Sequence, residues 1–514
     1  MDHKDVEDYL AQAAQLPPEQ EVVILRQLVR AQSKIITELL ETVQTLKQEV
    51  ADLKRQLYGR KSEKRHPEPA EPVGSLPTQK DRGKAPTRRD KAHVTDKGLR
   101  FTATSQVITI DVPAPAEDGI EIIDYEIIHR VAQRPAATVV LAYKIPIVKS
   151  ATGSLLPTWA PNQLWEGSYA DVSFIAGMLT DKFLYHLPLY RQHQRLKSNG
   201  IDLARSTLTS WSQHSIALLK PIYDALIKSI LTSSIIEMDE TPIKASRKIK
   251  GKMHTGYFWP ILGDQDEIAF MFANTRATSH IQKVLKSNFT GTLLTDGYGA
   301  YQAYAKSNEA MVHANCWAHW RRLFFECKDH FPEDAEMVLD TIASLYAIEA
   351  RLREESLPDN KKREIRLSES KPIVEKLFDW CEKRIQDKKL TPKSKLRKAL
   401  QYGLNRVEPL KVFLEDPALL MDTNQIERQI RPIAMGKRSW LFCWTEVGAE
   451  QVGIIQSLIA SCKLSGVDPY TYLVDVLFRV GSHPARQVHE LTPRYWKNLF
   501  ADQPYRSDLW GKGK

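Results

Sequence analysis

The sequence predicts an α/β protein whose central region forms a mixed sheet with helices on both sides. Two apolar, strand-like runs end in a carboxylate, one at Asp239 and one at Asp296. Between and after these runs, further strand-like segments alternate with amphipathic helical ones. A heptad pattern near the N-terminus adds a long helix before this core. Together these observations favour an α/β core preceded by a coiled coil.

The N-terminal helix is predicted from two apolar series, each with a spacing of seven residues. Its a positions are mostly β-branched and its d positions mostly leucine, which favours a parallel two-stranded coiled coil. The a series is Val22, Val29, Ile36, Val43, Val50 and Leu57, and the d series is Leu25, Gln32, Leu39, Leu46 and Leu53. We assign residues 19–59 to this helix. The alternative is a helix that packs its stripe on its own chain.

The coiled coil predicts a homodimer or higher oligomer. Replacing Leu39 and Leu46 by charged residues should weaken it by several kcal/mol, because buried apolar side chains become unpaired charges. Light scattering on the whole chain, and on a chain lacking residues 1–60, measures this. Monomers in both samples at micromolar concentration would contradict the prediction.

Residues 60–100 read as a disordered basic linker, because they are rich in Lys, Arg and Pro and poor in large apolar residues. Residues 101–165 alternate like short strands and form a small β-rich module. The first cysteine is Cys316, so a thiolate zinc site in this module is excluded.

The net charge of +9 suits a polyanionic partner. Five cysteines and no long apolar run predict a cytoplasmic protein without a membrane span.

Residues 166–228 read as helices with a turn at Asn199-Gly200. Ser206 is a candidate N-cap for the helix that follows. The pattern is compatible with a DNA-binding helix-turn-helix and equally with a plain helical hairpin. In the first case the residues near DNA are Arg205, Ser206, Thr209 and Ser210.

Residues 229–462 carry the order strand, strand, strand, helix, strand, helix, strand. The first strand ends at Asp239, the next two are 257–262 and 268–272, and helix 280–285 precedes the strand that ends at Asp296. A strand at 310–312 and a helix at 317–327 follow. This is the order of the ribonuclease-H-like fold. A charged helical insertion is expected at about 330–410, and a C-terminal tail at 463–514.

Asp239, Asp296 and Glu427 form the candidate catalytic site. Carboxylates at strand ends, joined by one from a short helix that Pro432 closes, suit two Mg²⁺ or Mn²⁺ ions. Each acid also has an ordinary interpretation: a turn or cap residue for the aspartates, and an i,i+4 pair with Arg431 for Glu427. Asp422 is the rival third ligand, and the neighbouring acids Glu240 and Glu450 are expected to lie off the site.

Several long motifs resemble the insertion sequence 66 family of bacterial transposases. They are LYGRKSEK at 57–64, HLPLYRQ at 186–192, MDETP at 238–242, TDGYGAY at 295–301, CWAHWRRLF at 316–324 and the stretch from Met421 to Glu450. The resemblance implies a DDE transposase with a ribonuclease-H-like core, in which Asp239, Asp296 and Glu427 are the metal-binding catalytic acids. It also implies DNA as the partner, small accessory proteins of the same element, and a bacterial, nucleoid-associated location.

Further residues are candidates for the chemistry or for DNA. Cys316-Trp317-Ala318-His319 resembles the Cys-x-x-His pair that follows the second acid in many DDE transposases, so His319 is expected beside the catalytic site. A separate metal site with His313, Cys327 and His330 is the alternative. The candidate DNA-backbone contacts are Arg321, Arg322, Arg428, Arg431, Lys437 and Arg438. A catalytically silent DNA-binding protein and a stand-alone nuclease remain the competing functions.

Overall fold

The computed structural model describes residues 93–94, 99–103, 105–114, 121–134, 137–150, 152, 163–246, 253–285, 289–388, 390–391, 393–440 and 445–510. The predicted coiled coil of residues 19–59 lies outside the described residues, as does most of the predicted linker. Within these ranges, no helix combines the length and the apolar character that crossing a bilayer requires.

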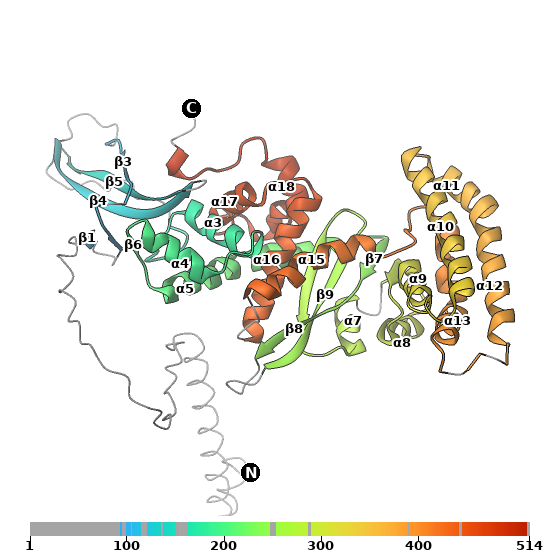
Figure 1. Ribbon diagram of the computed structural model, residues 1–514. Coiled ribbons are helices and arrows are strands. Elements are labelled where there is room, and N and C mark those ends of the chain that lie inside the picture. Colours follow the sequence, from blue (N-terminus) through green and yellow to red (C-terminus); the bar gives the residue numbers. More distant parts are fainter. Residues whose placement is uncertain are drawn as a thin grey trace, which may run out of the picture. The chain divides into compact units, whose positions relative to one another are not determined.

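A six-stranded mixed sheet forms the core of the described region (Figure 1). Its strands are β7 (Ile235–Met238), β8 (Thr241–Ser246), β9 (Met253–Gly263), β10 (Ile268–Ala273), β11 (Thr292–Thr295) and β12 (Val312–Asn315). They follow the order β10-β9-β7-β11-β12, with β8 also paired to β9. Strand β11 runs parallel to β7 and β12, whereas β9 is antiparallel to its neighbours. This topology is compatible with a ribonuclease-H-like core.

Two details of this sheet differ from the sequence prediction. Strand β8 was not expected, and it forms as a hairpin with the first half of β9, where Ile243 and Ala245 face the core. The last strand is Val312–Asn315 and not residues 310–312, because the chain turns at Asn308, where the Met311 amide donates to the Asn308 carbonyl. The pattern of polar and apolar residues in the sequence indicated neither strand β8 nor the bounds of β12.

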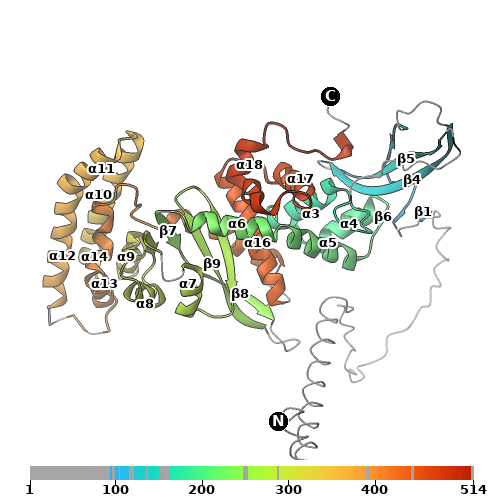
Figure 2. The ribbon, with the colours of Figure 1, turned by 180° about the vertical axis from the view of Figure 1, so that it is seen from behind.

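Helices pack on both sides of the sheet (Figure 2). Helix α6 (Lys220–Ile230) packs against β9 and β10, and α8 (Gly299–Ser307) packs against β12 and against α7 (Thr278–Leu285). Helix α9 (Trp317–Phe325) follows β12 directly. The buried apolar side chains of α6, α7 and α8 form one continuous core with the sheet, whereas those of α9 belong to a second core.

Helix α16 (Glu446–Leu464) covers the outer edge of β10. The hydroxyls of Ser457 and Ser461 accept hydrogen bonds from the backbone amides of Phe270 and Ile268, at 2.8 and 3.0 Å. A β-carbon at Gly453 would lie 2.5 Å from the Phe270 carbonyl oxygen, so only glycine allows this approach. The helix therefore provides hydrogen-bond partners for backbone groups of the edge strand β10, which would otherwise be open to pairing with another chain.

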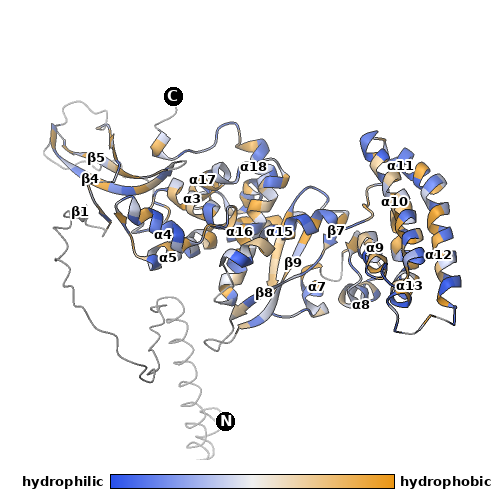
Figure 3. Cartoon of the chain, viewed as in Figure 1, coloured by the Kyte–Doolittle hydropathy of each residue, from blue (hydrophilic) through white to orange (hydrophobic). Residues whose placement is uncertain are grey.

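The helical insertion packs around a second hydrophobic core, which it shares with α9 and with Leu294 and Ala314 of the sheet. It comprises α10 (Pro332–Glu354), α11 (Asp359–Ile365), the π-helical turn η1 (Arg366–Ser370), α12 (Lys371–Ile385), α13 (Lys395–Leu404), α14 (Val407–Lys411) and the 3-10 turn η2 (Val412–Leu414). Leu345, Leu352 and Leu377 are buried, as the amphipathic stripes predict. Hydrophilic and hydrophobic residues alternate along these helices (Figure 3).

The described residues before the core form two small sheets and three helices. β1 (His93–Val94), β2 (Arg100–Phe101) and β6 (Ile201–Asp202) form one sheet, and β3 (Val107–Asp111), β4 (Glu121–Arg134) and β5 (Ala137–Lys149) form the other. The helices are α3 (Val172–Phe183), α4 (Leu189–Ser198) and α5 (Arg205–Leu218). Gly200 adopts a positive φ of 77° in the predicted turn between α4 and α5.

The prediction that Ser206 caps α5 is wrong. The capping position is Ala204, with extended backbone and no side-chain hydrogen bond, and Ser206 lies inside the first turn. The helix begins earlier because Leu203, buried after β6, fixes the direction in which the chain enters it. The helix therefore starts on a packing contact and not on a polar cap.

The prediction that Pro432 ends its helix is also wrong, because α15 (Asn424–Trp440) continues through it. Ile426 and Ile433 are fully buried on opposite sides of the proline, and Ile430 packs against the same core. Burial of these side chains offsets the backbone hydrogen bond that proline removes, which costs about 3 kcal/mol in a helix interior. The remaining elements are α17 (Pro469–Arg479), η3 (Ala485–Leu491), α18 (Pro493–Leu499) and η4 (Asp508–Trp510).

Candidate metal-binding active site

Asp239 and Asp296 lie side by side at the same edge of the sheet. Asp239 follows the last residue of β7, and Asp296 follows the last residue of β11. Because these two strands are parallel neighbours, with Leu294 opposite Glu237, their carboxyl ends bring both acids together. The order of strands in the sequence predicted that Asp239 and Asp296 lie close together, and the pairing of β7 with β11 brings them there.

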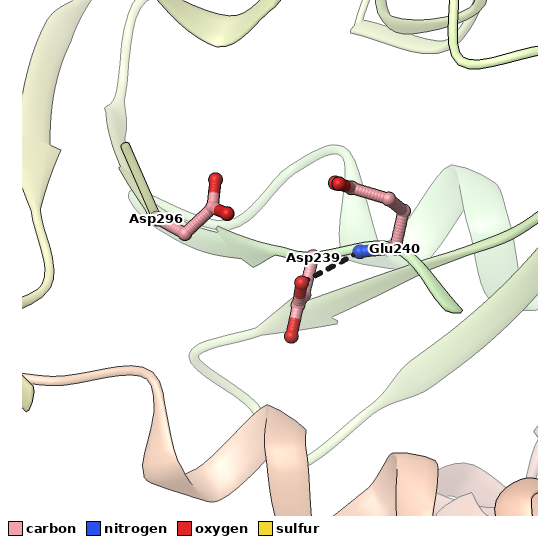
Figure 4. Close-up of side chains that lie close together, drawn as sticks. All are labelled: Asp239, Glu240 and Asp296. Atoms are coloured by element: carbon pink, nitrogen blue, oxygen red, sulfur yellow. Dashed lines mark hydrogen bonds between the residues drawn. The ribbon is translucent and has the colours of Figure 1, made fainter. Parts of the chain in front are cut away.

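A third carboxylate, Glu240, joins this pair. One oxygen of each of Asp239, Glu240 and Asp296 lies within 4.8 Å of the others. Glu240 was expected to lie away from the two aspartates, and the structure instead places its carboxylate beside theirs. Figure 4 shows the carboxylates of Glu240 and Asp296 directed toward the same space, whereas that of Asp239 turns away from them. Residues 239 and 240 belong to neither β7 nor β8, so strand alternation does not force their side chains apart.

Each carboxylate of this cluster has a defined hydrogen-bond partner. The Asp239 side chain accepts from the Glu240 amide at 2.7 Å, and the Asp296 side chain accepts from the Tyr298 amide at 2.9 Å. Glu240 accepts from the Tyr301 hydroxyl at 3.0 Å and is paired with the Arg276 guanidinium. The two aspartates are thus held by local backbone, whereas Glu240 is held by side chains from other elements.

The electrostatics of the cluster favour a bound cation. Burial, together with the charges of Glu240 and Asp296, raises the pKa of Asp239 to about 7, although the hydrogen bond from the Glu240 amide lowers it in part. Burial and Asp296 also raise the pKa of Glu240. Crowded, desolvated carboxylates repel one another, and a hard divalent cation relieves this repulsion. Oxygen donors of this kind fit Mg²⁺ or Mn²⁺.

Glu427 lies outside this group of three among the residues that the structure describes. It projects from the first turn of α15, its side chain is 43% exposed, and its Oε1 lies 3.7 Å from Nε2 of His319. A protonated His319 would also lower the pKa of Asp239, so the imidazole is near both Glu427 and the first aspartate. His319 thus lies near the cluster and beside Glu427, whereas Glu427 itself is not one of the three clustered carboxylates.

The start of α15 is fixed against the site by contacts that the sequence did not reveal. Ile426, in the first turn, donates its amide to the buried carboxyl of Glu237 on β7, whose pKa is raised to about 8 by burial and by Asp422. Asp422 itself accepts from the Asn424 amide at 3.0 Å, as a residue near the helix start would. Glu237 stands two residues before Asp239, so one strand positions both the first acid and the helix of Glu427.

Cys316 has a packing role in the same region. Its buried sulfur accepts from the Thr423 amide at 3.3 Å, and the next residue, Trp317, donates its amide to the Met421 carbonyl. Burial raises the pKa of the Cys316 thiol to about 11, so the thiol stays protonated. Among the described residues, Cys316, Cys327, His313 and His330 form no metal-binding group. The Cys-x-x-His pair therefore anchors α15 through Cys316 and contacts Glu427 through His319.

A layer of polar side chains beneath Asp296 holds its backbone. Thr295 and Asn315 donate to the Asp296 carbonyl at 2.9 and 2.8 Å, and the Thr295 hydroxyl also shares a hydrogen bond with Nε2 of His313. Arg406, from the insertion, donates to the Gly297 carbonyl at 2.9 Å. A β-carbon at Gly297 would lie 2.3 Å from the Tyr402 ring, so glycine is required there. The insertion thus supports the Asp296 loop directly.

His313 gives this layer a defined pH dependence. Burial and the charge of Arg406 lower its pKa to about 4. We expect its stabilising contribution to be fully present above the unfolded value of about 6.5 and to be lost as the pH falls from there through about 4. NMR titration of ¹³C-labelled histidine rings measures this. A His313 ring that titrates near pH 6.5 in the folded protein would contradict it.

The candidate DNA contacts lie on three helices. On α5, Arg205 and Ser206 are exposed, whereas Thr209 and Ser210 are partly buried and bonded within the helix. On α9, Arg321 and Arg322 are exposed, and Arg322 pairs with Glu326. On α15, the exposed residues are Arg428, Arg431 and Arg438. Lys437 is partly buried instead, and its ammonium donates to the Thr241 hydroxyl at 3.1 Å, beside Glu240.

Residues 167–451 match the Transposase IS66 family, and residues 457–494 match the IS66 C-terminal element. The chain belongs to the IS66 transposase family. Two similar proteins are the uncharacterized proteins y4jD and y4hP of Sinorhizobium fredii. The first is 33% identical over 67% of this chain and 69% of its own length, and the second is 30% identical over 67% and 65%. The chain thus spans about two thirds of these relatives.

The IS66 match confirms the resemblance seen in the motifs. The matched segment contains Asp239, Asp296, His319 and Glu427, and also Glu240. The sequence analysis did not place Glu240 and Arg276 beside the aspartates. The position of Glu240 directly after Asp239 could have indicated its proximity, but a residue next to a ligand on a strand normally faces away. Arg276 lies in a loop, and nothing in its neighbourhood in the sequence marks it.

Proposed function

We propose that this IS66 protein is a DNA transposase that cuts the ends of a bacterial insertion sequence and joins them to target DNA. The observation that carries the proposal is the contact between the two acid-bearing loops, at the ends of the parallel strands β7 and β11, within the segment that matches a transposase family. A mixed sheet in this order supports a ribonuclease-H-like core.

Asp239 and Asp296 would hold the divalent cations, Mg²⁺ or Mn²⁺, two per site, with Glu427 as the third acid. Two such ions stabilise the attacking and the leaving oxygen of an in-line phosphoryl transfer. The backbone amides of Glu240 and Tyr298 keep the two aspartates oriented, and the layer of Thr295, Asn315 and Arg406 fixes the second loop. His319 lies where its charge can offset that of the carboxylates.

The proposed reaction has two steps, and each is a displacement at the phosphorus of a phosphodiester. In the first, the oxygen of water bonds to the phosphorus at the transposon end, and the bond to the 3′ oxygen breaks, which leaves a 3′-hydroxyl and a 5′-phosphate. In the second, that 3′-hydroxyl attacks a target phosphodiester and the target 3′ oxygen leaves with the proton, so the number of phosphodiester bonds is conserved. The candidate cations of α5, α9 and α15 would hold the DNA backbone.

A stand-alone nuclease would cleave without joining, and a silent family member would bind DNA without cleaving it. Incubation of the full chain with Mg²⁺, a labelled transposon-end duplex and a target plasmid separates these functions. We expect joined products whose label is linked to plasmid DNA. Cleavage without joined product would favour the nuclease, and binding without cleavage would favour the silent protein. The DNA that flanks the gene is searched for paired inverted repeats to design the duplex, and small proteins encoded beside the gene are added in a parallel reaction.

A further inference from the structure

Arg276 connects the two loops that carry the candidate metal ligands. It lies in the exposed connection between β10 and α7. Its guanidinium carbon is 4.0 Å from the centroid of the Tyr298 ring and 5.7 Å from that of Tyr257. Its carbonyl accepts from the Tyr298 hydroxyl at 2.7 Å. Tyr298 comes two residues after Asp296, so the connection is fastened to the second acid-bearing loop.

The same guanidinium reaches the first acid-bearing loop through Glu240. Arg276 donates to Oε1 of Glu240, and the Tyr301 hydroxyl donates to Oε2 at 3.0 Å. The Glu240 side chain is only 4% exposed, against 40% for that of Arg276. Both oxygens of this buried carboxylate are therefore occupied by donors of the protein, and its negative charge is balanced by a cation.

Glu240 differs in this respect from its two neighbours. Asp239 and Asp296 each accept a short-range backbone amide on one oxygen. No cationic side chain is paired with either aspartate among the salt bridges of the described residues. Three carboxylates thus lie within 4.8 Å, but only one of them is neutralised by an arginine.

We propose that Arg276 is a positioning residue that withholds Glu240 from the metal site, so that Asp239 and Asp296 provide the cation-binding carboxylates from the sheet. This inference rests on the proposed function, since it assumes that the cluster binds a divalent cation. Arg276 sets the charge of the site: with the pair intact, its positive charge offsets that of Glu240, and without it the Glu240 carboxylate has no cation to balance it.

Removal of Arg276 should therefore tighten the binding of a divalent cation. A carboxylate within 5 Å that loses its counter-charge adds strong attraction even at the screening of a protein surface. We expect Arg276→Gln to bind Mn²⁺ about tenfold tighter than the unaltered chain, in the absence of DNA. Arg276→Lys, which keeps the charge but not the planar fork, should lie between the two.

Isothermal titration of the full chain with Mn²⁺ alone tests this. Glu240→Gln leaves the positive charge of Arg276 unbalanced and should weaken Mn²⁺ binding. The double variant Arg276→Gln/Glu240→Gln should return to the affinity of the unaltered chain, because neither charge of the pair is left. Arg351→Gln is the matched control, since Arg351 is similarly exposed, at 45%, and pairs with Glu369 in the insertion, away from the cluster. It should not change Mn²⁺ binding.

The possible failures are distinguishable. If Arg276→Gln binds Mn²⁺ equally or more weakly while Asp239→Asn and Asp296→Asn lose binding, the role of Arg276 is refuted and the metal site stands. If tighter binding persists in the double variant, the effect does not pass through Glu240 and the inference is also refuted. If the two aspartate variants bind Mn²⁺ as the unaltered chain does, the metal site itself, and with it the proposed function, is refuted.

Discussion

Replacing Asp239 or Asp296 by asparagine should lower the rates of strand cleavage and strand joining by roughly three orders of magnitude or more, while DNA binding persists. Asparagine keeps the shape of the side chain but removes a charge that a divalent cation needs, and the loss of several kcal/mol of transition-state stabilisation corresponds to such a factor. Gel assays of labelled transposon ends measure both reactions, and fluorescence anisotropy of the same DNA measures binding. Activity that survives in either variant would contradict the metal-site assignment.

The third acid is decided by a comparison of three variants. Glu427→Gln should be as damaging as the aspartate variants, because we propose Glu427 as the third acid and, among the described residues, its ion-pair partner is His319 at 3.7 Å and not an arginine. Glu240→Gln should cost no more than about tenfold, because Glu240 is held by Arg276 and Tyr301. Asp422→Asn should cost less still, since asparagine can also accept from the Asn424 amide. Full activity in Glu427→Gln with loss in Glu240→Gln would move the third ligand to Glu240.

The positions of the two aspartates were predictable because strong, short-range signals coincide there. Buried apolar runs fix β7 and β11, and an acid directly after each run must emerge at the sheet edge. That β7 and β11 are neighbours follows from the strand order of the fold and not from either run alone. The family motifs lie on these same segments, which is why the sequence predicted that the two aspartates lie close together.

The errors arose where tertiary contacts outweigh local rules. The position of Glu240 beside the aspartates was not predicted, because strand alternation normally places adjacent side chains on opposite faces. Residues 239 and 240 lie between β7 and β8, where this constraint does not hold. Pro432 was expected to end α15, but the buried isoleucines around it hold the helix together. Arg276 and Arg406 act from segments 20 or more residues away from the acids that they support, as the separation of Arg406 from Gly297 by 109 residues illustrates. No local pattern encodes such contacts.

The insertion depends on one buried ion pair. Arg366 is 3% exposed and makes two hydrogen bonds to the carboxylate of Glu349, at 2.8 and 2.7 Å. The same guanidinium donates to the carbonyls of Phe413, Asp416 and Leu419. These carbonyls lie in the segment that leads from the insertion into α15. One side chain thus joins the helix of Glu349, the π-helical turn and the approach to Glu427.

Replacing Arg366 by methionine should therefore destabilise the insertion by about 3–5 kcal/mol, because it leaves the buried Glu349 carboxylate and the three carbonyls without their donor. Urea unfolding followed by tryptophan fluorescence measures this, since Trp317 and Trp320 lie in the same core. Arg363→Met is the control, because Arg363 and its partner Glu415 are both more than half exposed, and it should change the stability by less than about 1 kcal/mol. The double variant Arg366→Met/Glu349→Leu should recover most of the loss, since no buried charge is then left unpaired. A loss below about 1 kcal/mol in Arg366→Met would show that the fold of the insertion, and the path of the chain into α15, do not depend on this pair.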